Sequence, residues 1–194
     1  MTAKEKLLSI AAAEVGYLEK KTAADLDSKA GNAGKNNYTK YARDYFPSLQ
    51  GQPWCDMFCD WCMITAFRKD LAAKMIGGFD AYTPASADKY KRLGRWFSKP
   101  EVGDQIFFKN EKRIYHTGLV EKVESGRVYT IEGNTSDGAE VIPNGGAVCR
   151  KSYPLNHPGI AGYGRPRWEL VEVKSPRKYA DGWNRNGIGW WYVY

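Results

Sequence analysis

The pattern of apolar residues changes its period near residue 100, and this change limits the possible fold more than any other feature of the sequence. Before it, apolar residues recur at helical spacing in four segments, which are 2–16, 38–46, a stretch beginning near Cys55, and 86–93. After it, short runs rich in β-branched and aromatic residues alternate with turns, at 105–108, 116–120, 127–131, 147–150 and 160–163. Helices followed by strands predict an α+β fold in which N-terminal helices pack on an antiparallel β-sheet.

The composition is that of a soluble globular protein with one main domain. The chain has 194 residues, of which 43% are hydrophobic and 26% are charged. The formal charge of +7 favours an acidic partner, but the basic residues are scattered, so a nucleic-acid site is weakly supported and an anionic cell-wall polymer fits the charge as well. The short N-terminal apolar stretch contains Glu14, so we expect no signal peptide, no membrane insertion and synthesis in the cytoplasm.

The stretch from Gln52 to Cys62 holds the first candidate for chemistry. Pro53 suits the start of a helix, which predicts that a helix begins at about Cys55. The first helical turn offers free backbone N–H groups and a partial positive charge, and both favour a thiolate over a thiol. Cys55 is therefore a candidate nucleophile. The alternative is a structural role, because free cysteine is among the residue types most often buried.

The same helix allows a second interpretation from a different class of protein. Cys55, Cys59 and Cys62 form a C-x3-C-x2-C pattern that resembles the iron–sulfur signature of radical S-adenosylmethionine enzymes. Against it, the pattern lies inside an amphipathic helix, and the chain is too short for most barrels of that family. We expect no disulfides, since three cysteines share one helix and Cys149 lies far along the chain.

A second candidate group is predicted in the sheet. His116 begins one strand, and Glu132 and Asn134 end the next, with a turn near Ser125 between them. With that turn, His116 lies opposite Asn134, and Glu132 is one diagonal away on the same face. An imidazole beside a carboxylate or amide is what a cysteine nucleophile requires, because the imidazole supplies a base near neutral pH and its neighbour fixes its orientation.

Each of these residues also has a structural alternative. A lone histidine more often has a structural role than a catalytic one, and Glu132 is equally typical of a solvated charge at a strand end. His157, beside Pro158 in a turn, is assigned no function. The joint occurrence of all the candidates at one predicted site favours the functional interpretation.

The long polar segment 20–37 is predicted to be a loop. It offers oxygen ligands of the kind that calcium prefers, on Asp25, Asp27, Asn32, Asn36 and Asn37, but it lacks the spacing of an EF-hand loop. A solvated loop is therefore the favoured interpretation.

Five ordered motifs resemble those of CHAP domains. They are Pro53–Trp54–Cys55, the run 100–108, the run 116–120, the run 131–135 and Gly162–Tyr163–Gly164–Arg165–Pro166. The resemblance covers about residues 4–168 and implies the papain-like fold of the NlpC/P60 cysteine peptidases. It also implies hydrolysis of an amide bond in bacterial peptidoglycan, by an N-acetylmuramoyl-L-alanine amidase or by a stem-peptide or cross-bridge endopeptidase. Many members are bacteriolytic phage endolysins or autolysins, so the resemblance implies action on the cell wall after holin-mediated or lytic release.

The resemblance implies a role for each site residue. Cys55 would be the nucleophile and His116 its base, with Glu132 orienting the imidazole and Asn134 polarising or positioning it. Gln52, with the backbone N–H of Cys55, would stabilise the oxyanion. Substrate contacts are expected from Trp54, Asp56 and Tyr115. No cofactor is required, and calcium is disfavoured because residues 46–54 contain no acidic side chain.

The last twenty residues differ in character from the rest. We expect a catalytic domain over 1–170, a linker over 171–178, and over 179–194 a partial repeat that resembles the first hairpin of a choline-binding or glucan-binding wall repeat. Aromatic residues between glycine turns can bind sugars or quaternary amines, here Trp183, Trp190, Trp191 and Tyr192. An aromatic tail that only docks on the domain is the alternative. Peptidoglycan, teichoic acid and choline are thus the expected partners of a monomeric protein.

Overall fold

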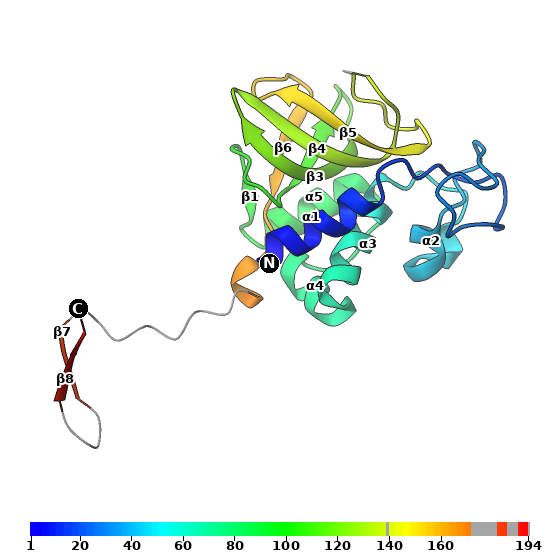
Figure 1. Ribbon diagram of the computed structural model, residues 1–194. Coiled ribbons are helices and arrows are strands. Elements are labelled where there is room, and N and C mark those ends of the chain that lie inside the picture. The colour runs from blue at the N-terminus through cyan, green and yellow to red at the C-terminus, as the bar shows by residue number, and fades with distance from the viewer. Residues whose placement is uncertain (139, 172–181, 186–189, 194) are drawn as a thin grey trace.

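The computed structural model describes residues 1–138, 140–171, 182–185 and 190–193 of the chain. Within these residues, a group of helices packs against one antiparallel sheet (Figure 1). The sheet has six strands in the order β1-β6-β2-β3-β4-β5. The predicted α+β fold is therefore confirmed.

The helical layer is formed almost entirely by the first half of the chain. Helix α1 begins with a capping box, in which the Thr2 hydroxyl accepts from the Glu5 N–H and the Glu5 carboxylate accepts from the Thr2 N–H. The helices are α1 (Ala3–Ala13), α2 (Lys40–Tyr45), η1 (Pro47–Leu49), α3 (Cys55–Phe67), α4 (Lys69–Ile76), α5 (Thr83–Arg92) and η2 (Trp168–Leu170). Helix α4 was not predicted from the sequence.

The sheet contains the five predicted strands and one addition, the short edge strand β1. Its strands are β1 (Trp96–Phe97), β2 (Gln105–Lys109), β3 (Ile114–Glu124), β4 (Arg127–Thr135), β5 (Ala147–Pro154) and β6 (Ile160–Gly164). The β3–β4 hairpin turns at Ser125 and Gly126, both with positive φ, as the two-residue turn of such a hairpin requires. This confirms the predicted turn, although a register shift between Val120 and Lys122 was not foreseen.

Helix α3 is the centre of the molecule. All its side chains are buried except Trp61 and Thr65, so it is buried nearly all round rather than along one stripe. It contacts α1, α2, α4, β3 and β4. At Gly133 on β4, an added Cβ would lie 2.6 Å from the Phe58 Cβ, so only glycine allows the strand to approach the helix this closely.

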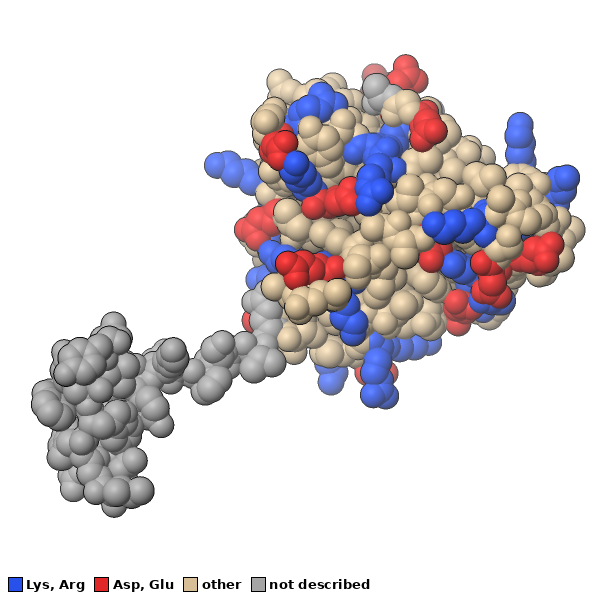
Figure 2. Space-filling view, viewed as in Figure 1, with Lys and Arg blue, Asp and Glu red and all other residues tan. Residues whose placement is uncertain are grey.

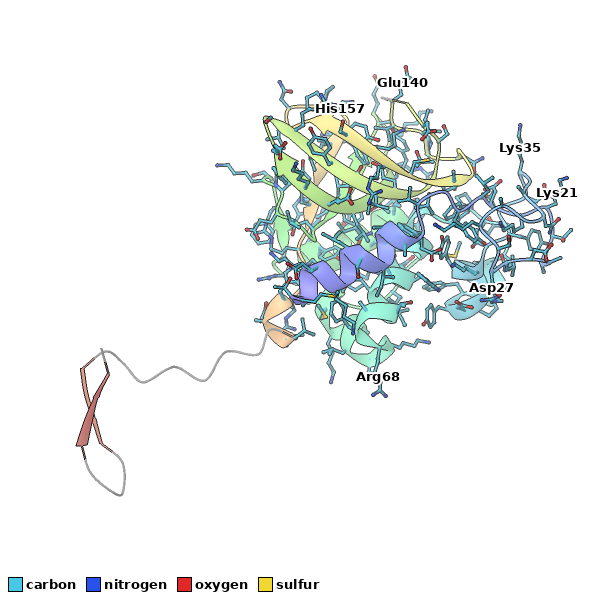
Figure 3. The ribbon with its side chains drawn as sticks, in the orientation of Figure 1. Lys21, Asp27, Lys35, Arg68, Glu140 and His157 are labelled. Atoms are coloured by element: carbon cyan, nitrogen blue, oxygen red, sulfur yellow. The ribbon has the colours of Figure 1, made fainter. Side chains whose placement is uncertain are left out.

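The polar segment before α2 is a loop, as predicted, and its polar side chains are largely used to fold it. Arg43 on α2 donates two hydrogen bonds to the Asp27 carboxylate, at 2.7 and 2.8 Å, and Asn32 and Asn36 donate to backbone carbonyls within the loop. Figure 3 shows Lys21 and Lys35 pointing away from this loop into solvent. Within the described residues, no group of three or more acidic, histidine or cysteine side chains is arranged to hold a metal ion.

Near the C-terminus, β7 (Gly182–Arg185) and β8 (Trp190–Val193) pair as an antiparallel two-stranded sheet. The side chains of Trp183, Trp190, Trp191 and Tyr192 lie outside the described part of the structure, as does the segment 172–181, so the predicted linker and sugar-binding surface stay predictions. No helix among the described residues is long and apolar enough to cross a bilayer.

Candidate active site

Cys55 lies in the first turn of α3, as the sequence predicts. Pro53 and Trp54 precede it, and Trp54 is the N-cap residue of the helix. The Cys55 side chain is 5% exposed and lines a surface hollow of about 400 Å³, which also includes Gln52 and Tyr115. The thiol therefore lies at the start of a helix and also lines a cleft.

His116 and Glu132 are in direct contact. Their side chains are both fully buried, and His116 Nε2 lies 2.8 Å from Glu132 Oε2. The imidazole also stacks on Phe108, with ring centroids 5.8 Å apart and an angle of 30° between the rings. The structure thus fixes the plane of the ring and engages one of its two nitrogen atoms.

The other ring nitrogen, Nδ1, is buried and has no hydrogen-bond partner within the described residues. Burial lowers the pKa of His116, but the neighbouring side chains of Cys55 and Glu132 outweigh it, and the pKa rises from 6.5 to about 9. A thiolate and a carboxylate beside an imidazole favour its protonated form, and this suits an acid that must deliver a proton to a leaving group.

Glu132 is held by two hydroxyl groups that sequence reasoning missed. Thr130 Oγ1 donates to Glu132 Oε1 at 2.5 Å, and the Tyr153 hydroxyl donates to Oε2 at 3.3 Å. Gly118, next to His116 on the same face of β3, leaves room for this carboxylate, because an added Cβ would lie 2.5 Å from Glu132 Cγ. The contact of Thr130 with Glu132 could have been predicted from the sequence, since residues two apart on a strand share a face. The contact of Tyr153 could not, because it depends on how β5 pairs with β4.

Asn134 is placed differently from Glu132. Its φ is +56°, its side chain is buried, and neither the oxygen nor the nitrogen of the amide has a hydrogen-bond partner within the described residues. Of the two candidate partners for His116, the structure therefore brings Glu132 into contact and leaves the Asn134 amide unpaired.

The structure places two of the predicted substrate contacts in the interior, where both side chains are fully buried. Trp54 packs on Tyr41 and donates from Nε1 to Glu19 Oε2 at 3.0 Å. Asp56 accepts from Gln105 Nε2 at 2.9 Å, and burial raises its pKa to about 6. These residues therefore anchor the first turn of α3 from behind. The third predicted contact, Tyr115, is half-buried and does line the hollow.

The iron–sulfur interpretation finds no support. Cys59 and Cys62 are buried in the core, where burial raises the pKa of both thiols well above the ordinary value. The three helix cysteines form no group suited to a metal ion within the described part of the chain. All four cysteines are free thiols, as expected.

Comparison with known proteins points to one domain family. Residues 47–134 match the CHAP domain family, and this stretch contains every residue of the predicted site, from Gln52 to Asn134. The match supports a CHAP-domain protein, the class that the sequence motifs indicated. The domain is associated with hydrolysis of peptidoglycan by amidases and peptidases.

One solved structure resembles the chain in fold. It is described as "The crystal structure of Ly7917" and gives a TM-score of 0.50 at 13% sequence identity. The match covers 87% of this chain, which spans 63% of the length of that protein. No curated protein sequence matches the chain.

Proposed function

We propose that this protein hydrolyses an amide bond of bacterial peptidoglycan with a Cys–His–Glu site. The observation that carries the proposal is the arrangement of Cys55 at the start of α3, in a cleft, beside an imidazole whose pKa it raises and whose Nε2 contacts a buried carboxylate. This is the arrangement that a thiol nucleophile needs: a base within reach, and a third group that orients the base.

The reaction then follows in two steps. Transfer of the thiol proton to His116 first gives a Cys55 thiolate beside an imidazolium. The thiolate then attacks the amide carbonyl, and His116 passes its proton to the leaving amine as the C–N bond breaks. Water, deprotonated by His116, then attacks the thioester and releases the acid. The backbone N–H of Cys55 and the exposed side chain of Gln52 are suited to stabilise the oxyanion, and one such donor commonly contributes about 3 kcal/mol.

The biological setting is a further part of the proposal. An endolysin or autolysin would reach the wall from the cytoplasm through a holin or after lysis, and the segment 179–194 would add affinity for wall polymers. Figure 2 shows basic and acidic side chains interspersed on the visible face. Because the basic residues are also scattered along the sequence, the net charge of +7 is expected to act as a general attraction to anionic walls.

Mass spectrometry of digested walls tests this function. Purified walls treated with the protein should release fragments with new amino termini and no new reducing ends, because an amide and not a glycosidic bond is cut. A new N-terminal L-alanine would identify an amidase, and a new amine within the stem peptide or cross-bridge would identify an endopeptidase. A protein that pellets with walls yet releases no new amino terminus would be a binding module, and the proposal would fail.

A further inference from the structure

The cleft at Cys55 continues into a second hollow. The first has a volume of about 400 Å³ and contains Cys55, and the second has a volume of about 430 Å³. Both are lined by Pro53, Arg113 and Tyr115, so these three residues mark the junction between them. An extended substrate lying across the thiol would pass this junction.

Arg113 carries a free charge at the junction. Its backbone is fixed by a tight turn, in which the Asn110 side chain accepts from the Arg113 N–H at 2.9 Å and the Arg113 carbonyl accepts from the Asn110 N–H at 3.0 Å. The guanidinium lies over the Tyr82 ring, 5.7 Å from its centroid. It is exposed and makes no ion pair with any described residue.

One acidic residue shares the first hollow with this guanidinium, and none lines the second among the described residues. Asp80 is the only other charged residue that lines either hollow within the described structure, and it lines only the first of them. Its Oδ1 accepts from the Tyr82 N–H at 2.8 Å, and it forms no ion pair with Arg113. Among the described residues, Arg113 is therefore the only charged residue that lines the second hollow.

We propose that Arg113 binds a carboxylate of the substrate at this junction, so that the enzyme prefers peptides with a free acid group there over the corresponding amides. The guanidinium presents a planar fork of donors that matches a carboxylate, and its contact with Tyr82 holds that fork on one side of the cleft. This inference rests on the proposed function and adds the chemical class that the substrate must carry beside the cut bond.

A pair of muramyl peptides tests it, identical except that one carries a carboxylate where the other carries a carboxamide. For the unaltered protein, KM should be lower for the acid. In Arg113→Gln, KM for the acid should rise roughly tenfold or more, with little change for the amide and little change in kcat. Arg113→Lys should retain part of the preference. The matched control is Arg92→Gln, because Arg92 is exposed, makes no ion pair with any described residue and lines neither of these two hollows.

Binding separates failure of this inference from failure of the proposed function. Both peptides are titrated calorimetrically into Cys55→Ala, with and without Arg113→Gln. Tighter binding of the acid that disappears with Arg113→Gln supports the inference even if no peptide is cut. Equal binding of acid and amide, or a preference that persists in Arg113→Gln, overturns it, whether or not the walls are hydrolysed.

Discussion

Replacing Cys55 with alanine is expected to lower the rate of wall hydrolysis by roughly ten-thousandfold or more, because the variant has no sulfur to form the thioester. The loss should appear in kcat, measured from the release of new amino termini. Binding to walls should persist, because the substitution removes one small side chain that is 5% exposed.

Cys59→Ala is the matched control, one helical turn further along α3. Cys59 is 1% exposed and belongs to the core, so this variant should lose some thermal stability and keep activity within a few-fold. The comparison also separates the two interpretations of the cysteine pattern, since a cluster with three thiolate ligands would need Cys55 and Cys59 equally. Wall hydrolysis that survives in Cys55→Ala would exclude the thiol mechanism.

The second large effect is expected for Glu132→Gln, which should lower kcat by roughly a hundredfold to ten-thousandfold. Glutamine keeps the shape of the side chain but removes its charge, and its amide can donate to His116 Nε2 and so stabilise the wrong tautomer. The carboxylate is one of the groups that raise the pKa of His116 to about 9, so the pKa should fall in the variant. A lower pKa means that the imidazolium loses its proton at lower pH, and the alkaline limb of the activity profile should move to lower pH.

Ring signals of His116 in NMR spectra measure this directly, because the chain has only two histidines. Glu121→Gln is the control, since Glu121 also lies on the sheet but pairs with Arg150. It should leave both the titration of His116 and the rate unchanged. An unchanged pKa of His116 in Glu132→Gln would show that the carboxylate does not act on the ring.

The sequence predicted the parts of this molecule that depend on local chemistry. Pro53 and the apolar spacing after it placed the start of α3 at Cys55, and the turn at Ser125 placed His116 and Glu132 on neighbouring strands. Both signals act over a few residues, and the structure agrees with them. The burial of α3 on nearly all sides also follows from its composition, although only one face was predicted.

Features that depend on distant parts of the chain were missed. Strand β1 has two residues and exists only because it pairs with β6. Trp54 and Asp56 flank Cys55 and looked available to a substrate, but Glu19 and Gln105 hold them in the interior. No sequence pattern marked Arg113 as a cleft residue, because its position there depends on how the turn before β3 packs near Pro53 and Tyr82.

Helix α4 was missed for a local reason. Arg68 separates it from α3 with a φ of +65° and makes no side-chain capping bond at its start. Figure 3 shows Arg68 projecting from this junction. A break without a glycine, a proline or a capping residue has no marker in the sequence.

Limited alkylation with iodoacetamide near neutral pH tests the central claim most directly. Burial raises the pKa of Cys59 and Cys62 well above the ordinary value and that of Cys149 to about 11, whereas Cys55 lines the cleft. Peptide mapping should therefore find one adduct, on Cys55, and wall hydrolysis should fall in proportion to the fraction modified. A protein fully modified at Cys55 that still hydrolyses walls at the original rate would contradict the account.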